Sequence, residues 1–376
     1  MKGIKRRHRH ARFTVQKTAS DYFARGDGRD VAAAIHQFGI EAAGKSTPKT
    51  FKPDFVYHYS PTKSASSRNP APTNSEEVES APAPKISREQ AEAWLAKHNR
   101  NAMSLLAAFR AMGDTNYLNE AATNFPNDPH VELAVLARDE FPADRRKWLD
   151  LFKQSSPSNS LANYLSAEDD FKNGKSDEAM QELLAASGKS QFEMFETESR
   201  LDGQDLYLSS GQSELASLEN SRLDFSGETI KSLADFRLLA QSIGDLQKQY
   251  VDANDPNSVA NLAALGMSLA NQLQTGDGSK LLVNQLVGSG EERLFISKLD
   301  QNTSYDFLDG KTPDQVVQDL KRQKILWVQT VKSFDSIYPT LPDSEKISFQ
   351  NRENVFGEPT AMQWLFQQHP PANPTK

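Results

Sequence analysis

The sequence contains no cysteine, which excludes disulfide bonds, thiolate nucleophiles and cysteine-bound metals. It also lacks any run of 18 apolar residues, the length that a helix needs to cross a membrane. β-Strand patterns are scarce, because residues 55–59 form the only β-like run and no second run is available to pair with it. These absences favour a helical protein that does not span a membrane.

Charge is unevenly distributed along the chain. Residues 1–70 hold 14 Lys and Arg against 5 Asp and Glu, a net charge of +9, and the remaining residues hold 29 against 45, a net charge of −16. Such a basic arm either binds an anionic surface, which can be nucleic acid or lipid, or stays solvated or docks on its own domain. Six cations lie within residues 2–12: Lys2, Lys5, Arg6, Arg7, Arg9 and Arg12.

The segment after this arm, residues 13–29, is polar and lacks the apolar stretch of a signal peptide. We therefore expect a cytoplasmic protein. A peripheral membrane or exported protein, with the basic N-terminus next to a membrane, is the alternative.

Residues 39–46 formally match a phosphate-binding P-loop through Gly39, Gly44, Lys45 and Ser46. A P-loop follows a strand and opens a helix, whereas residues 30–38 have a helical pattern and Pro48 follows the motif. We interpret the match as accidental and expect no nucleotide and no other cofactor. The seven histidines also lack any zinc-binding spacing, so we expect no metal site.

Proline and polar residues mark a linker before the main helical region. The predicted organisation is a basic flexible arm (1–12), a helical hairpin (13–45), a disordered linker (46–85), helical repeats (86–200), a C-terminal helical region (201–368) and a disordered tail (369–376).

A helical pattern recurs three times between residues 101 and 190. In each of the three pairs, a turn separates the two expected helices, and these turns lie at Gly113, Pro142 and Gly174. The first two pairs end near Pro126 and Pro157. The turns are 29 and 32 residues apart, which is close to the 34 residues of the tetratricopeptide repeat (TPR).

The first of these units resembles a TPR at individual positions. Its matching residues are Phe109, Gly113, Asp114, Tyr117, Ala121 and Pro126. The resemblance implies an all-α fold, namely a TPR-like α-solenoid of antiparallel helix pairs, with additional C-terminal helices after residue 200. It also implies a concave face that is lined by the first helix of each pair and binds a peptide or protein.

Helix-start signals continue into the C-terminal region. Asp255-Pro256 and Thr312-Pro313 each place an N-cap residue before a proline at the first helical position. They predict helices at 256–274 and 313–334, with others at 87–98, 228–251 and 280–299. Gly288 and Gly290 predict a turn or kink within the last of these.

No reactive side chains occur at a catalytic spacing, so we expect a protein-binding scaffold and not an enzyme. An enzyme with an unrecognised site remains an alternative. If the TPR geometry holds, the exposed first-helix side chains that contact the partner are Arg110, Asn163, Asp169 and Asp170.

Overall fold

A computed structural model describes residues 86–371. Within this range the chain forms 14 α-helices and four short 3₁₀ helices, and no β-strand. The prediction of an all-α fold is therefore confirmed. The predicted arm (1–12), hairpin (13–45) and linker (46–85) lie outside the described residues, and so do residues 372–376 of the predicted tail.

Seven helices come first, and their ends follow local capping signals. Ser87 forms a capping box with Gln90 at the start of α3, and Gly113 ends α4 in the left-handed conformation, with a φ of 65°. This backbone conformation favours glycine because the residue has no Cβ. The helices are α3 (Arg88–Lys97), α4 (Ala102–Met112), α5 (Thr115–Asn124), α6 (Pro129–Arg138), α7 (Arg145–Ser155), α8 (Leu161–Lys172) and α9 (Ser176–Ser187).

Helices α4 to α9 pack in sequence as neighbours. α4 contacts α5, α6 contacts α7, and α8 contacts α9, while α5 contacts α6 and α7 contacts α8. The pairing of helices that the sequence predicts is thus present. A regular TPR-like superhelix remains a prediction.

The second half of the described chain is built from longer helices. Asp255 and Thr312 cap α12 and α14 as predicted, each before a proline in the first turn. The helices are α10 (Glu196–Ser209), α11 (Glu214–Asp252), α12 (Pro256–Gln274), α13 (Leu282–Ile296), α14 (Pro313–Ile337), α15 (Asp343–Phe356) and α16 (Glu358–Gln368), and the 3₁₀ helices are η1 (Pro142–Asp144), η2 (Gly276–Lys280), η3 (Asp306–Leu308) and η4 (Tyr338–Thr340).

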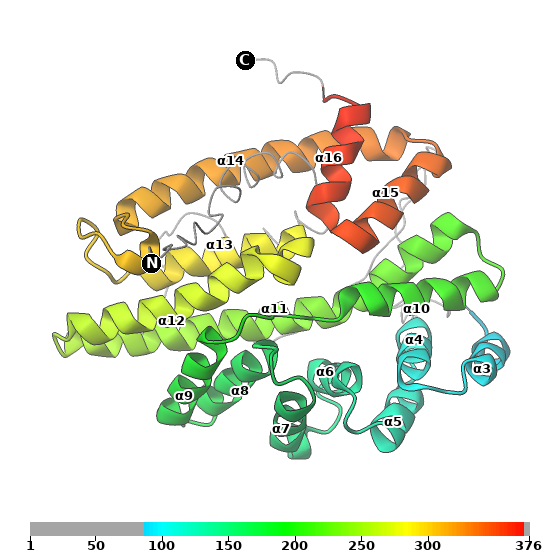
Figure 1. Cartoon of the computed structure of the whole chain (residues 1–376), viewed down its shortest axis with the longest axis horizontal. Coiled ribbons are helices and arrows are strands. Elements are labelled where there is room, and N and C mark those ends of the chain that lie inside the picture. The colour runs from blue at the N-terminus through cyan, green and yellow to red at the C-terminus, as the bar shows by residue number, and fades with distance from the viewer. Residues whose placement is uncertain (1–85, 372–376) are drawn as a thin grey trace, which may run out of the picture. The chain divides into compact units, whose positions relative to one another are not determined.

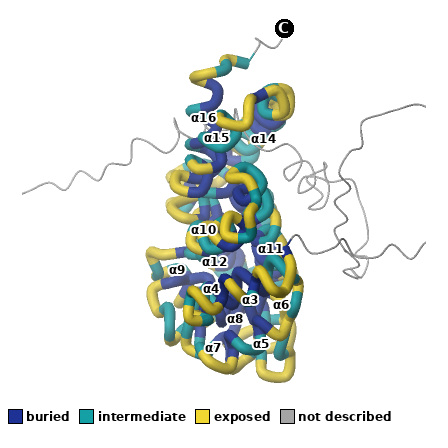
Figure 2. The backbone as a smooth tube through the Cα atoms, turned by 90° about the vertical axis from the view of Figure 1, so that its right-hand side faces the viewer, coloured by how far each residue is buried: buried dark blue, intermediate teal, exposed yellow. Residues whose placement is uncertain are grey.

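The 39-residue helix α11 is the centre of the described region. It contacts α4, α6 and α8, which are the first helices of the three pairs, and it also contacts α12, α13 and α15. Figures 1 and 2 both show α11 between the α3–α9 layer and the α14–α16 helices. One apolar core continues from Ile86 to Phe295 and includes Leu233, Phe236 and Leu239 of α11. Helices α4 to α9 and α11 therefore share a single core.

Two features of the second half differ from the sequence-based expectations. Gly288 and Gly290 lie inside α13, so they do not form a turn that interrupts the helix. A Cβ at Gly288 would lie 2.9 Å from the Ala270 carbonyl oxygen, which indicates that this glycine permits close packing of α13 on α12. The predicted boundary at residues 200 and 201 falls inside α10.

Candidate functional site

The inner face, defined as the surface of α4, α6 and α8 that contacts α11, is where the sequence places partner binding. Arg110 on α4 lies there with only 4% of its side chain exposed, and Glu228 on α11 is 2% exposed. The Arg110 guanidinium donates to both carboxylate oxygens of Glu228, at 2.8 and 3.0 Å. Such a buried, bidentate ion pair holds α11 on the inner face.

The other three predicted residues are also engaged within the chain. Asn163 donates to Glu182 at 2.6 Å, Asp170 accepts from Arg146 at 2.9 Å, and Asp169 lies 3.5 Å from Arg145. Arg145 also lies 3.8 Å from Asp235 on α11. The expectation that these side chains and Arg110 are exposed is wrong, because residues of α7, α9 and α11 pack against them. Their binding of a partner stays a prediction.

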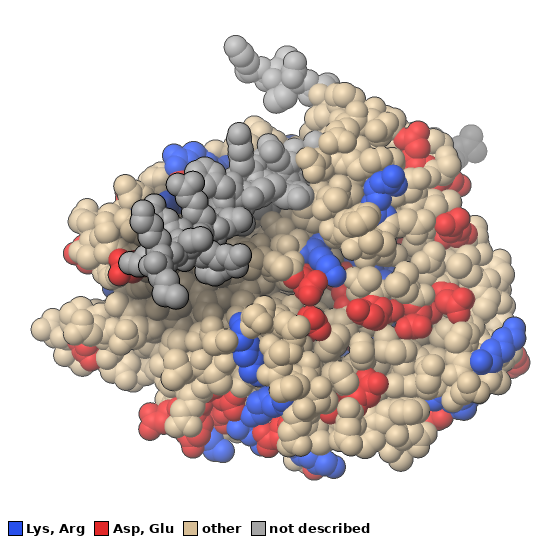
Figure 3. Space-filling model, in the orientation of Figure 1, with Lys and Arg blue, Asp and Glu red and all other residues tan. Residues whose placement is uncertain are grey.

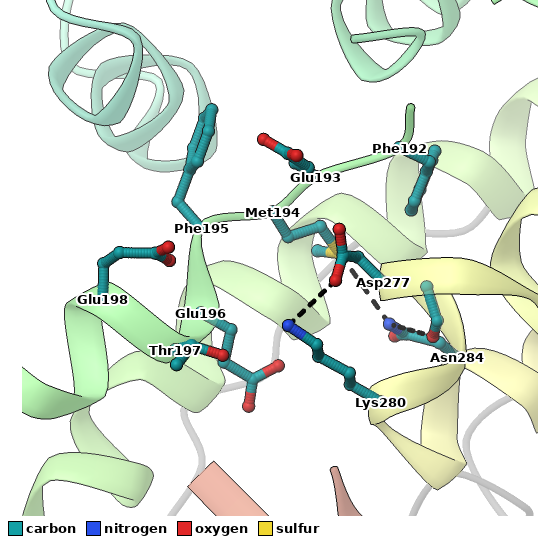
Figure 4. Close-up of a pocket in the computed structure, with 11 residues that line it drawn as sticks. Phe192, Glu193, Met194, Phe195, Glu196, Thr197, Glu198, Asp277, Lys280 and Asn284 are labelled. Carbon is teal, nitrogen blue, oxygen red and sulfur yellow. Dashed lines mark hydrogen bonds and ion pairs between the residues drawn. The ribbon is translucent and has the colours of Figure 1, made fainter. Parts of the chain in front are cut away.

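A different concave site lies between the segment that joins α9 to α10 and the region around η2. This acidic pocket has a volume of about 90 Å³. Figure 4 shows carboxylate groups from both segments around its opening. Its lining residues are Phe192, Glu193, Met194, Phe195, Glu196, Thr197, Glu198, Asp277, Gly278, Lys280 and Asn284.

Asn159 fixes the first wall of the pocket. Its side-chain amide donates to the carbonyl oxygen of Glu193 at 2.9 Å and accepts from the backbone N–H of Glu193 at 3.0 Å. Asn159 is fully buried. These two hydrogen bonds satisfy both backbone polar groups of Glu193, as a neighbouring β-strand would, and they hold an otherwise irregular segment in place.

Phe195 turns the chain from this wall into α10. Its φ is 55°, in the left-handed region that non-glycine residues rarely adopt. Its ring packs on the rings of His130 and Phe152, with centroid distances of 4.4 and 6.2 Å. This packing stabilises the turn, which places Glu196 and Glu198 in the first turn of α10, where the positive end of the helix dipole favours carboxylates.

Charge within the pocket is mostly negative. Lys280 is the only cation among the lining residues, and it already pairs with Asp277 at 2.8 Å. Glu196 pairs with Arg200, at 2.5 Å, in a buried cluster beneath the pocket. Among residues 86–371, no ion pair or hydrogen bond engages the carboxylates of Glu193 and Glu198. Burial raises the pKa of Glu193, and the nearby charges of Asp277 and Glu198 raise it further.

Buried contacts near the pocket join α10 to α15 and α13 to α16. Arg200 donates to Glu353 at 2.7 Å, and Glu358 accepts from the Leu282 backbone N–H at 2.6 Å. Burial raises the pKa of Glu358 to about 8, and repulsion from Glu353 adds to the effect.

A second cavity, of about 410 Å³, lies between α12, α13 and the start of α14. Its two cations, Lys311 and Arg322, both bind Asp319. The charged groups of that cavity thus largely neutralise one another, unlike those of the acidic pocket.

No sequence signal identified the acidic pocket. The stretch from Phe192 to Glu198 does contain two aromatic and three acidic residues around the start of α10. Asp277 and Asn284 lie about eighty residues further along the chain, however, and only the fold brings them to the same site. The P-loop match at Gly39, Gly44, Lys45 and Ser46 lies outside the described residues.

No protein-family model matches this chain, and no curated protein or solved structure is significantly similar to it. Among the described residues, no three His, Asp or Glu side chains are grouped to hold a metal ion. None of the helices from α3 to α16 has the length and apolar character to cross a membrane.

Proposed function

We propose that the chain is a helical scaffold that binds a protein partner through a basic segment of that partner. The observation that carries this proposal is the acidic pocket, in which the carboxylates of Glu193 and Glu198 have no ion pair within residues 86–371. Carboxylates that repel one another and are held in place by buried neighbours favour a cationic ligand.

An acidic ridge on α10 continues from the pocket and supports the same proposal. Glu198, Asp202 and Asp205 are spaced four and three residues apart, so they lie along one face of the helix. Figure 3 shows acidic side chains gathered over α10 and α11. Burial raises the pKa of Asp202, and the charge of Asp205 raises it further, whereas Arg110 lowers it. A basic segment that followed this ridge would relieve the repulsion.

The inner face is a poorer candidate for the partner surface than the TPR resemblance implies. A partner could reach α4, α6 and α8 only by displacing α11, together with the buried Arg110–Glu228 pair. Breaking a buried pair leaves an uncompensated charge and costs about 3–5 kcal/mol. We therefore assign partner binding to the acidic pocket and the ridge.

An affinity capture with matched baits tests this function. The pocket variant combines Glu193→Gln with Glu198→Gln, and the control combines Asp177→Asn with Glu178→Gln, two exposed acidic residues in the first turn of α9. The full chain and the control should retain the same protein in a stoichiometric complex that salt dissociates, and the pocket variant should lose it.

Each bait is also prepared without residues 1–12, because the chain's own basic arm has the charge to occupy the same site. Deletion of the arm should strengthen partner capture if the arm competes, and leave it unchanged if it does not. Equal capture by the pocket variant and the wild type, or no protein retained by any bait, would contradict the proposed function.

A further inference from the structure

We infer that the acidic pocket is a binding site for a primary ammonium group, such as the end of a lysine side chain. This inference rests on the proposed function and specifies the chemistry that the site recognises. It depends on three features of the pocket: the unpaired carboxylates, a buried acceptor without a donor, and the size and apolar flank of the cavity.

The buried acceptor is the side-chain oxygen of Asn284. This residue is 2% exposed and lines the pocket, and its amide nitrogen donates to the Gly278 carbonyl oxygen at 3.0 Å. Its Oδ1 has no hydrogen-bond partner among the described residues. A buried acceptor without a donor is unfavourable, so a ligand that supplies an N–H to Oδ1 is stabilised. Figure 4 shows the Asn284 amide beside Asp277 and Met194.

An ammonium group matches the acceptors that surround this cavity. It is a compact cation with three donors and no acceptor. Glu193 lines the pocket from the segment that joins α9 to α10, Asn284 lines it from α13, and Asp277 already shows that it can bind a lysine, since it pairs with Lys280. A guanidinium, by contrast, is a planar fork that suits a single carboxylate approached along two parallel bonds. Acceptors spread over two walls favour the ammonium.

The cavity is also the right size for an ammonium and the end of its alkyl chain. A buried water needs about 10–15 Å³ of such space, and the pocket provides about 90 Å³. Phe192 and Met194 supply apolar surface on the same wall as Glu193. Lysine stems pack on apolar surface of this kind while the charged end reaches a polar partner.

Two sources can present this group, namely a lysine of a protein segment and a free diamine. Calorimetric titration of the full chain at low ionic strength tests one ligand for each source. A lysine-containing tripeptide with blocked ends represents the protein segment, and 1,5-diaminopentane represents the free diamine. The comparison ligands are the same tripeptide with an acetylated lysine and with arginine in place of lysine. We expect the lysine peptide to bind at least about tenfold more tightly than the acetylated peptide, because a charge-assisted hydrogen bond is lost.

Substitutions in the pocket should change the affinity in opposite directions. Glu193→Gln should weaken binding of the lysine peptide about tenfold, since it removes an acceptor's charge. Lys280→Met should strengthen binding several-fold, because it removes the cation that competes for Asp277. The control Glu178→Gln, on α9, should leave the affinity unchanged. Thermal unfolding of each variant verifies that it is folded.

Equal affinity for the lysine and acetylated peptides, equal affinity for the arginine peptide, or an unchanged affinity in Glu193→Gln would overturn the inference. Its failure is distinguishable from failure of the proposed function. If the pocket binds ammonium groups but captures no protein, the inferred site is supported as a small-molecule site and the proposed scaffold function is contradicted. If the pocket is needed for protein capture but binds no ammonium group, the proposed scaffold function is supported and the inferred lysine recognition is contradicted.

Discussion

Glu291 illustrates how strongly this fold perturbs single residues. Its side chain is fully buried on α13, and neither carboxylate oxygen has a hydrogen-bond partner within residues 86–371. Burial raises the pKa of Glu291 to about 8, although the charge of Arg237 opposes the shift. The folded protein therefore holds a proton on this carboxyl at neutral pH, whereas the unfolded chain releases it near pH 4.3.

This difference predicts a loss of stability as pH rises. Below about pH 4 Glu291 is protonated in both the folded and the unfolded protein. Its contribution to the free energy of unfolding is then at its most favourable. Between about pH 4 and pH 8 the unfolded state alone is ionised, and stability falls by up to about 1.4 kcal/mol per pH unit. The substitution Glu291→Gln removes this titration. The free energy of unfolding of the variant, from urea denaturation at pH 5 and pH 8, should therefore decline less than that of the wild type.

The exposed substitution Glu178→Gln, on α9, is the matched control and should retain the wild-type dependence on pH. Other buried carboxyls also titrate in this interval, since burial raises the pKa of Glu132 to about 7. For this reason the informative quantity is the difference between the variant and the wild type. Parallel curves for Glu291→Gln and the wild type would mean that Glu291 does not hold a proton in the folded state.

Close packing between the long helices α11, α12 and α13 depends on glycines at their contacts. A Cβ at Gly266 on α12 would lie 2.5 Å from the Phe295 ring of α13, which is closer than any real contact. A Cβ at Gly244 on α11 would lie 3.8 Å from Leu294, an ordinary van der Waals contact. Both glycines are inside helices, so they differ in packing but not in helix propensity.

The two glycines should respond to the same substitution with opposite signs. Gly244→Ala should stabilise the protein by about 0.5–1 kcal/mol, because alanine loses less backbone entropy in a helix. Gly266→Ala should destabilise it by about 1–3 kcal/mol through overpacking against Phe295, less the same propensity gain. Urea denaturation measures both. A stabilised Gly266→Ala would mean that α12 and α13 are not packed as closely as described.

The prediction of elements from sequence succeeded where a helix carries its own start signal. Asp255 and Thr312, each before a proline, gave correct starts for α12 and α14 because capping depends on only a few neighbouring residues. The first third of α11, residues 214–227, was missed, since its buried positions include Ser217 and Ser221, which weaken the apolar stripe. Gly203 of α10 lies against Ser221 there, so close approach replaces apolar bulk.

At the scale of the whole described region, α11 and helices α4 to α9 depend on one another. A repeat array buries its core between neighbouring units and tolerates truncation at a unit boundary. Here the core that includes Leu105, Leu133 and Tyr164 of α4, α6 and α8 also includes Leu233 and Phe236 of α11. The inner face of the helix pairs is therefore part of the interior.

A chain ended after residue 212 should consequently fail to form the native packing of α4 to α9, because α11 no longer covers the inner face. We expect it to retain helical circular dichroism but to lose a cooperative thermal transition and to bind a hydrophobic dye. The intact chain, measured in parallel, should unfold cooperatively. Cooperative unfolding of the truncated chain, without dye binding, would show that α4 to α9 form an independent array.

The sequence by itself determined that the described chain is helical and where many of its helices begin, because caps, prolines and apolar spacing act over a few residues. Only the tertiary structure decided that α11 covers Arg110 and the inner face, and that Glu193 meets Asp277 and Asn284 in one pocket. Those contacts join residues roughly eighty to a hundred and twenty positions apart, and their free energy depends on burial that no local pattern encodes.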